Sequence, residues 1–173
     1  MEAAAAQPFP WNVYFPMLFL TSVRMSTLRQ MRWDEIDLRH KPALWQIQTT
    51  KNDDPLTLTL ADTAVEMLKE LKPNKKKSDW IFPMASDPSR CISDVDHAWL
   101  RVTKAANLKD ARIHDLRRSA ATYALRSGMS LPAVQKAGGW RTLNAVSVYA
   151  RAEIQDAKKA ATAVEDVFMS LNK

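Results

Sequence analysis

All three glycines of this 173-residue chain lie in one stretch, between Ile113 and Arg151. Glycine relaxes the backbone where a helix has to end, so Gly128 is expected to close one helix and Gly138 the next. The pattern predicts a series of short helices whose ends fix the positions of the side chains that follow them.

Four side chains in this stretch suggest a chemistry. His114 and Arg117 lie three residues apart in a helical pattern, Trp140 follows the paired glycines, and Tyr149 comes nine residues after the tryptophan. A tyrosine hydroxyl can act as a nucleophile, and a guanidinium can hold two phosphoryl oxygens while neutral donors complete the cage. Taken singly, Tyr149 could equally be a half-buried helix tyrosine and Trp140 a core residue.

The helix that carries His114 and Arg117 is expected to have two distinct faces. At 100° per residue, His114, Arg117 and Ala121 share one face. The packing face is predicted to hold the apolar side chains Leu116, Ala120, Tyr123 and Ala124. Separate faces favour a functional site over a histidine that merely packs in a core.

Arg24 stands at the expected entrance of another helix. Trp11 to Thr21 is apolar enough for a buried first helix, and Ser26 can cap a second one that runs through Arg32. Backbone N–H groups and the positive end of the helix dipole gather at such an entrance, so Arg24 would help to bind an anion there. The alternative is an exposed surface arginine.

The middle of the chain predicts a small antiparallel sheet. Trp33 to Leu38 leads into one strand, Leu44 to Thr49 forms a second, and Leu56 to Leu60 forms a third. A turn between the last two carries Lys51, which either serves chemistry or simply solubilises the turn. With helices on both sides of this segment, the fold class is expected to be α+β, mainly helical, with a three-stranded antiparallel sheet.

The bulk composition limits the classes of function. A formal net charge of +6 and a sequence pI near 9.5 favour a polyanionic partner. With Cys91 as its single cysteine the chain cannot form an internal disulfide, which fits a reducing cytoplasm. The most apolar run, Val13 to Leu20, is too short to span a membrane. Three scattered histidines and one cysteine make no metal set, so neither a metal nor another cofactor is expected.

Taken in order, these residues resemble the catalytic core of the tyrosine recombinase, or phage integrase, family. The spacing from His114 through Arg117 and Trp140 to Tyr149 carries the resemblance. Thr21 to Leu28 is similar to the family's first-arginine box, Thr-Gly-x-Arg-x-Ser-Glu-Leu, with Arg24 at the arginine position. Ser22 replaces the usual glycine and Thr27 the usual acidic residue, which puts full activity in question.

The resemblance implies a mechanism and assigns roles to six residues. The tyrosine would attack a DNA phosphate, leaving a 3′-phosphotyrosine and a free 5′-hydroxyl, and rejoining would follow by reversal without ATP. Two arginines would clamp the phosphate, a histidine would assist proton transfer, a lysine would protonate the leaving oxygen, and an indole N–H would complete the cage. The resemblance assigns the attack to Tyr149 and the phosphate clamp to Arg24 and Arg117. It assigns the proton transfer to His114, protonation of the leaving oxygen to Lys51 and the indole N–H to Trp140.

The same resemblance sets expectations for domains and partners. Residues 1–10 would be a linker or tail, and residues 11–173 the catalytic domain, with a C-terminal helix over 153–173 that docks either on its own domain or on a neighbouring protomer. Partners would be double-stranded DNA with an att-type site and other protomers, in a tetramer on DNA, and an N-terminal DNA-binding domain would be missing. The protein would act in the cytoplasm. Alternatives are a catalytically weakened, recombinase-derived DNA-binding protein and a helical interaction module.

Overall fold

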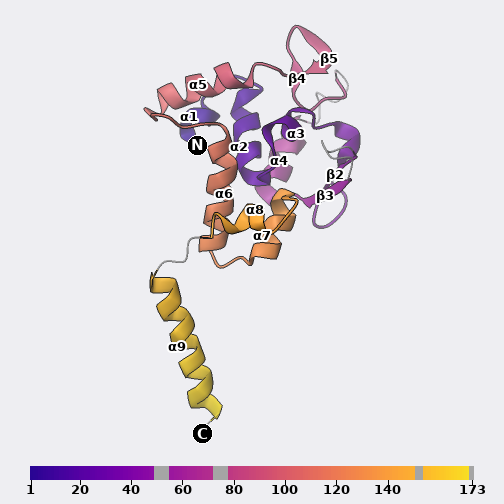
Figure 1. Ribbon diagram of the computed structural model, residues 1–173. Helices are drawn as coiled ribbons and strands as arrows, with labels where there is room; N and C mark the ends of the chain where they lie inside the picture. Colours follow the sequence, from indigo (N-terminus) through magenta and orange to yellow (C-terminus); the bar gives the residue numbers. More distant parts are fainter. Residues whose placement is uncertain (49–54, 72–77, 151–153, 172–173) are drawn as a thin grey trace.

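The computed structural model describes residues 1–48, 55–71, 78–150 and 154–171 (Figure 1). Helix α2 (Trp11–Thr21) runs through the main body, and α6 (His114–Arg126) lies against it. The other helices surround this pair or extend beyond it: α1 (Glu2–Ala5), α3 (Met25–Arg29), α4 (Asp62–Leu71), α5 (Val95–Ala105), α7 (Leu131–Gly138), α8 (Asn144–Ser147), α9 (Ile154–Leu171) and the 3-10 turn η1 (Trp33–Glu35).

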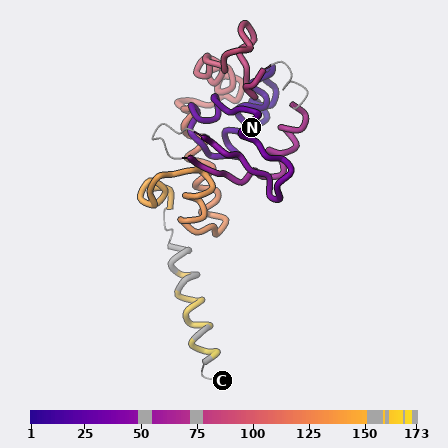
Figure 2. Tube along the Cα trace, turned by 90° about the vertical axis from the view of Figure 1, so that its right-hand side faces the viewer, coloured from indigo at the N-terminus to yellow at the C-terminus, as the bar shows by residue number. Residues whose placement is uncertain are grey.

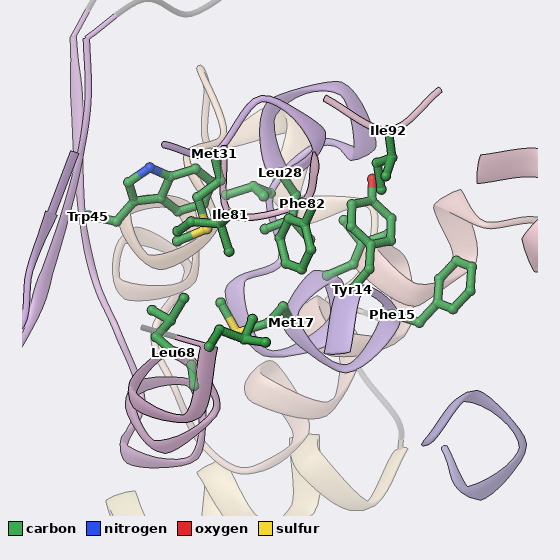
Figure 3. Close-up of a cluster of buried hydrophobic side chains, with 14 of the residues drawn as sticks. Tyr14, Phe15, Met17, Leu28, Met31, Trp45, Leu68, Ile81, Phe82 and Ile92 are labelled. Carbon is green, nitrogen blue, oxygen red and sulfur yellow. The ribbon is translucent and has the colours of Figure 1, made fainter. Parts of the chain in front are cut away.

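Helix α2 is apolar on all sides because it lies inside the main core. Tyr14, Phe15 and Met17 are completely buried, and Figure 3 shows them with side chains from α3, α4 and β2. Pro16 lies inside the helix, which nonetheless runs from Trp11 without a break. The buried Tyr14 hydroxyl donates a hydrogen bond to the Met25 carbonyl at 2.8 Å, so this core also fixes the start of α3.

The predicted three-stranded sheet is confirmed. Strands β1 (Ile36–Asp37), β2 (Leu44–Ile47) and β3 (Leu56–Thr59) pair antiparallel in the order β1-β2-β3. Trp45 is buried beneath the sheet, and its indole N–H donates to the Glu35 carboxylate at 3.0 Å. The α+β, mainly helical fold class is therefore correct. Lys51, which the sequence places in the turn between β2 and β3, lies outside the described residues.

A second, two-stranded hairpin was not expected. Strands β4 (Pro83–Met84) and β5 (Asp87–Cys91) pair antiparallel. Asp87 shapes this hairpin because its carboxylate accepts hydrogen bonds from both the amide and the hydroxyl of Ser89. The polar sequence of this hairpin lacks the alternation of apolar and polar residues that marks a half-buried strand, so the sequence did not predict it.

Helices α6, α7 and α8 enclose a second, smaller core. Ala121, Val134, Trp140 and Val146 are buried together in it. The predicted packing face of α6 is partly correct, because Leu116 and Ala124 pack against the two cores. The prediction was wrong for Tyr123, which is 65% exposed, and it left out Arg117 and Ala121, which are buried. The periodicity of α6 shows that it has two faces, but the second core lies against the face that carries the arginine.

The ends of these helices follow the glycines as predicted. Gly128 and Gly139 adopt the left-handed conformation, with φ of 92° and 65°, just beyond α6 and α7. Ser130 caps α7 by accepting a hydrogen bond from the Ala133 amide. The prediction for Ser26 was wrong, since α3 begins at Met25 with Arg24 at the N-cap, and no side chain caps it.

Helix α9 lies apart from the main body in both Figure 1 and Figure 2. Val164 and Met169 on this helix are 71% and 58% exposed. Packing of the C-terminal helix on its own domain, one of the two expected arrangements, is therefore absent from the described part of the chain. At the other end, residues 2–5 form α1, and Ala4 is buried in the main core. Among the described residues, no helix combines the length and hydrophobicity needed to cross a membrane.

Candidate active site

A pocket of about 470 Å³ opens where α3, α6, β3 and the end of α7 meet. Arg24 reaches it from the N-cap of α3, and Arg117 from α6. The described residues around it include four cationic side chains and no acidic one, so the pocket suits an anion. Its remaining lining is Val23, Thr27, Pro55, Leu56, Pro132, Gln135, Lys136, Gly138, Gly139, Trp140 and Arg141.

Arg117 is the best-fixed side chain of this pocket. It is only 4% exposed, and its Nη1 donates to the carbonyl of Ser22 and, at 2.9 Å, to that of Gly138. Its Cζ atom lies 3.8 Å from the centroid of the Trp140 ring, a cation–π contact. Its Nη2 and Nε make no hydrogen bond within the described part of the chain, and neither atom is shut away from solvent. These donors therefore remain available to a ligand.

The charge of Arg117 is costly in this position. Burial, together with the neighbouring cation Arg24, lowers the pKa of Arg117 to about 10, while negative charge on Tyr149 opposes the shift. The guanidinium stays protonated at neutral pH. Its ionised form is disfavoured because the described residues provide no carboxylate to pair with it, and a bound phosphate would relieve that cost.

His114 begins α6 and is exposed at the helix start. Partial burial of its ring lowers the pKa of His114 below its ordinary value, and the cations Arg117 and Arg118 lower it further. The imidazole is therefore predominantly neutral at pH 7, a form that can accept a proton.

Tyr149 follows α8, and this short helix places it beside Trp140. Its amide donates to the Val146 carbonyl at 2.9 Å, and Val146 is completely buried in the second core. The rings of Trp140 and Tyr149 lie edge to face, with centroids 6.3 Å apart. Five of the six predicted residues are thus described. Trp140 contacts both Arg117 and Tyr149, Arg24 is close enough to lower the pKa of both Arg117 and His114, and Lys51 is outside the described residues.

The two departures from the first-arginine box have structural counterparts. Ser22 has φ of 53°, a left-handed conformation that glycine adopts without strain, which explains why glycine is usual at this position. Thr27 lines the anion pocket, where an acidic residue would have faced the two arginines. Its hydroxyl makes no charge-assisted hydrogen bond.

The sequence interpretation missed three lining residues, Gln135, Lys136 and Arg141. Lys136 and Arg141 lie on either side of the Gly138-Gly139-Trp140 motif in the sequence. These flanking cations could have indicated that both residues belong to an anion pocket. A separate groove of about 780 Å³ runs along α6, and Tyr149 is one of the residues that line it. Its exposed walls include Tyr123, Met129 and Val148. Among the described residues no cluster of His, Cys, Asp or Glu could hold a metal ion.

Comparison with known proteins settles the family. A model described as the phage integrase family matches residues 1–156, which is most of the chain. The chain belongs to the phage integrase family. The integrase of Salmonella phage P22 is 27% identical over 159 residues, which cover 86% of this chain and 41% of the relative. A tyrosine recombinase of Thermosipho africanus (strain TCF52B) is 27% identical over 135 residues, covering 77% of this chain and 46% of the relative.

Solved structures have the same fold. The XerA recombinase superposes with a TM-score of 0.74 at 18% identity, over 92% of this chain and 58% of that one. The XerH site-specific recombinase, solved as a pre-cleavage complex with its difH substrate, also gives a TM-score of 0.74, at 20% identity, over 92% of this chain and 50% of that one. This member of the phage integrase family spans less than half the length of the two relatives named above.

Proposed function

We propose that this chain is the catalytic part of a site-specific DNA recombinase that integrates or excises phage or prophage DNA. The observation that carries this proposal is the position of Arg117. Its free donors face an anion pocket shared with Arg24, and its stacking partner Trp140 contacts the ring of Tyr149. These contacts support a single site that combines a phosphate clamp with a hydroxyl nucleophile.

Cleavage would proceed by attack of the Tyr149 hydroxyl oxygen on a DNA phosphate. A bond forms between that oxygen and phosphorus, the bond from phosphorus to the 5′-oxygen breaks, and a 3′-phosphotyrosine remains. Arg24 and Arg117 would neutralise the developing charge, a contribution that commonly dominates such catalysis. Neutral His114 would take up the tyrosine proton. Lys51 would protonate the leaving oxygen, the role that the family resemblance assigns to it.

Double-stranded DNA is the proposed substrate. The chain carries a formal net charge of +6, and the pocket beside the nucleophile has four cationic residues. Two features of relatives support the same substrate, since XerH is described as bound to difH, and a shufflon-specific DNA recombinase of Escherichia coli is 25% identical over 138 residues. Phosphate contacts position DNA without reading its sequence, so site choice would require contacts beyond this pocket.

The proposed assembly extends beyond this chain. We place the catalytic domain at residues 11–173, working in the cytoplasm with an N-terminal DNA-binding domain and with other protomers in a tetramer on DNA. Helix α9 would dock on a neighbouring protomer, which is consistent with its position apart from the body and with the exposed groove along α6 that Tyr149 lines. Docking of this kind would link cleavage to assembly.

The decisive experiment incubates the protein with a nicked att-type duplex that traps the cleaved state. A covalent protein–DNA adduct on a denaturing gel is expected for the natural sequence and not for Tyr149→Phe, which loses only the hydroxyl. Tyr123→Phe, a tyrosine on α6 that is 65% exposed, is the matched control and should form the adduct normally. An adduct from Tyr149→Phe would show that another residue is the nucleophile. Salt-dependent DNA retention without any adduct would instead indicate a recombinase-derived DNA-binding protein.

A further inference from the structure

The glycine at position 138 has no conformational reason to be glycine. Gly138 is the last residue of α7 and, unlike Gly128 and Gly139, does not have a positive φ. An L-residue could adopt its backbone conformation, and alanine would favour the helix. A reason for glycine must therefore come from the space around it.

The indole of Trp140 occupies that space. A Cβ atom at position 138 would lie 1.7 Å from Cζ3 of Trp140, 2.4 Å from Cε3 and 2.6 Å from Cη2. These atoms belong to the six-membered half of the indole, so this half lies directly against the backbone of Gly138. The side chain of Trp140 is 8% exposed and belongs to the second core, which leaves it little room to shift.

The same ring also contacts Arg117, whose Cζ lies 3.8 Å from the ring centroid. The Gly138 carbonyl completes the arrangement by accepting a hydrogen bond from Arg117 Nη1 at 2.9 Å. Gly138 thus contacts both Trp140 and Arg117. The side on which another residue would carry its Cβ faces the tryptophan, and the carbonyl faces the arginine.

The backbone at the end of α7 fixes this geometry. The Trp140 amide donates to the Gln135 carbonyl at 3.0 Å and the Gly139 amide to the Lys136 carbonyl at 3.3 Å, which together form a Schellman cap. The cap folds the chain back so that residue 140 covers residue 138. Any side chain at position 138 would meet the indole there.

We propose that Gly138 is a positioning residue for the phosphate clamp. It leaves room for the Trp140 ring to contact the Arg117 guanidinium, so that Nη2 and Nε of Arg117 are held toward the pocket. Trp140 then has two roles. Its ring face orients Arg117. Its indole N–H makes no hydrogen bond within the described part of the chain and is not shut away from solvent, so it stays available to the phosphate. The catalytic consequence of this arrangement rests on the proposed function, but the positioning itself does not.

The test is a double-mutant cycle in the whole 173-residue chain, which compares Gly138→Ala, Trp140→His and the double variant with the natural sequence. Histidine can still donate a hydrogen bond, but it lacks the six-membered ring that the new methyl group would strike. We expect Gly138→Ala alone to lower adduct formation at least tenfold, and to change it less than twofold in the Trp140→His background. Equal losses in the two backgrounds would overturn the proposal, because Gly138 would then act independently of the indole.

An NMR measurement tests the positioning without any cleavage. An aromatic face over a guanidinium shifts the Arg117 side-chain proton resonances upfield, and we expect Gly138→Ala and Trp140→His each to move them back. Gly128→Ala is the matched control. It also replaces a glycine just beyond a helix of the second core, but a Cβ there meets nothing within 4 Å, so the Arg117 resonances should stay in place despite some loss of stability. The expected shifts would support the positioning role even in a chain that forms no adduct, and unchanged Arg117 resonances in Gly138→Ala would overturn it.

Discussion

Arg117 divides its donors between the protein and the pocket. An arginine has five N–H donors in a fixed fork. In this chain the two on Nη1 go to the carbonyls of Ser22 and Gly138, and the three on Nη2 and Nε remain for a ligand. A lysine has the same charge, but its single nitrogen cannot reach two carbonyls and hold two phosphate oxygens at once.

We therefore expect Arg117→Lys to lower adduct formation by roughly 100-fold or more, the usual cost of removing a donor aimed at transition-state charge. DNA retention should be nearly unchanged because the net charge is the same. Arg118→Lys is the control, since this neighbour on α6 is exposed and paired with Asp115 at 3.6 Å. Similar adduct yields from Arg117→Lys and the natural protein, measured on the nicked duplex, would contradict a bidentate clamp.

The lowered pKa of His114 gives a prediction for pH. Because folding holds the pKa of His114 below its ordinary value of 6.5, the unfolded chain takes up the proton more readily than the folded one. The contribution of His114 to stability is therefore fully present above pH 6.5 and falls as the pH drops through that value. We expect an NMR titration, assigned with His114→Gln, to place its midpoint below 6.5. A midpoint above 6.5 would mean that the neighbouring arginines do not act on the ring.

The elements around the site show what a sequence can and cannot reveal. The glycines located the ends of α6 and α7 correctly, because the end of a helix depends on residues close in sequence. The contact from Arg117 to the Ser22 carbonyl spans 95 residues, and no local pattern encodes it. The burial of Arg117 and Ala121 on α6 was missed for the same reason, since the position of the second core decides which face is buried.

The end of α7 supplies a second pair of cations, Lys136 and Arg141, to the pocket rim. Both are exposed, and neither makes an ion pair within the described part of the chain. We expect Arg141→Ala to weaken DNA binding and to reduce the slope of log affinity against log salt by about one, as for a contact to one backbone phosphate. Cleavage at saturating DNA should change little.

Arg101→Ala provides the comparison for that measurement. Arg101 is an exposed arginine on α5, which lies at the other end of the main body from α7 (Figure 1). Fluorescence anisotropy over a range of salt concentrations should give this variant the slope of the natural protein. Equal slopes for Arg141→Ala and the natural protein would show that the rim arginine contacts no phosphate.

At the scale of the molecule, α9 is the element with the least packing. It lies away from the body in both views of the chain, so its removal should cost the body little stability (Figures 1 and 2). We expect a chain that ends at Ala150 to unfold at nearly the same temperature as the whole chain. The whole chain should sediment as a monomer at low micromolar concentration, because one docking helix rarely offsets the entropy of association without DNA. A tight dimer, or a large fall in the unfolding midpoint on truncation, would contradict this arrangement.

The connection from Arg117 to Ser22 and Gly138 also determines when the chain becomes reactive. These two carbonyls lie on opposite sides of Arg117 in the sequence, and the second core that buries the arginine is completed only by Val146. During synthesis on a ribosome, the main core can gather around α2 long before Trp140 and Tyr149 emerge. A growing chain that reaches DNA in that interval has neither an oriented clamp nor a nucleophile, so it cannot leave a strand broken. Under the proposed function, the order of residues along the polypeptide would delay strand breakage until the chain has been synthesised past Tyr149.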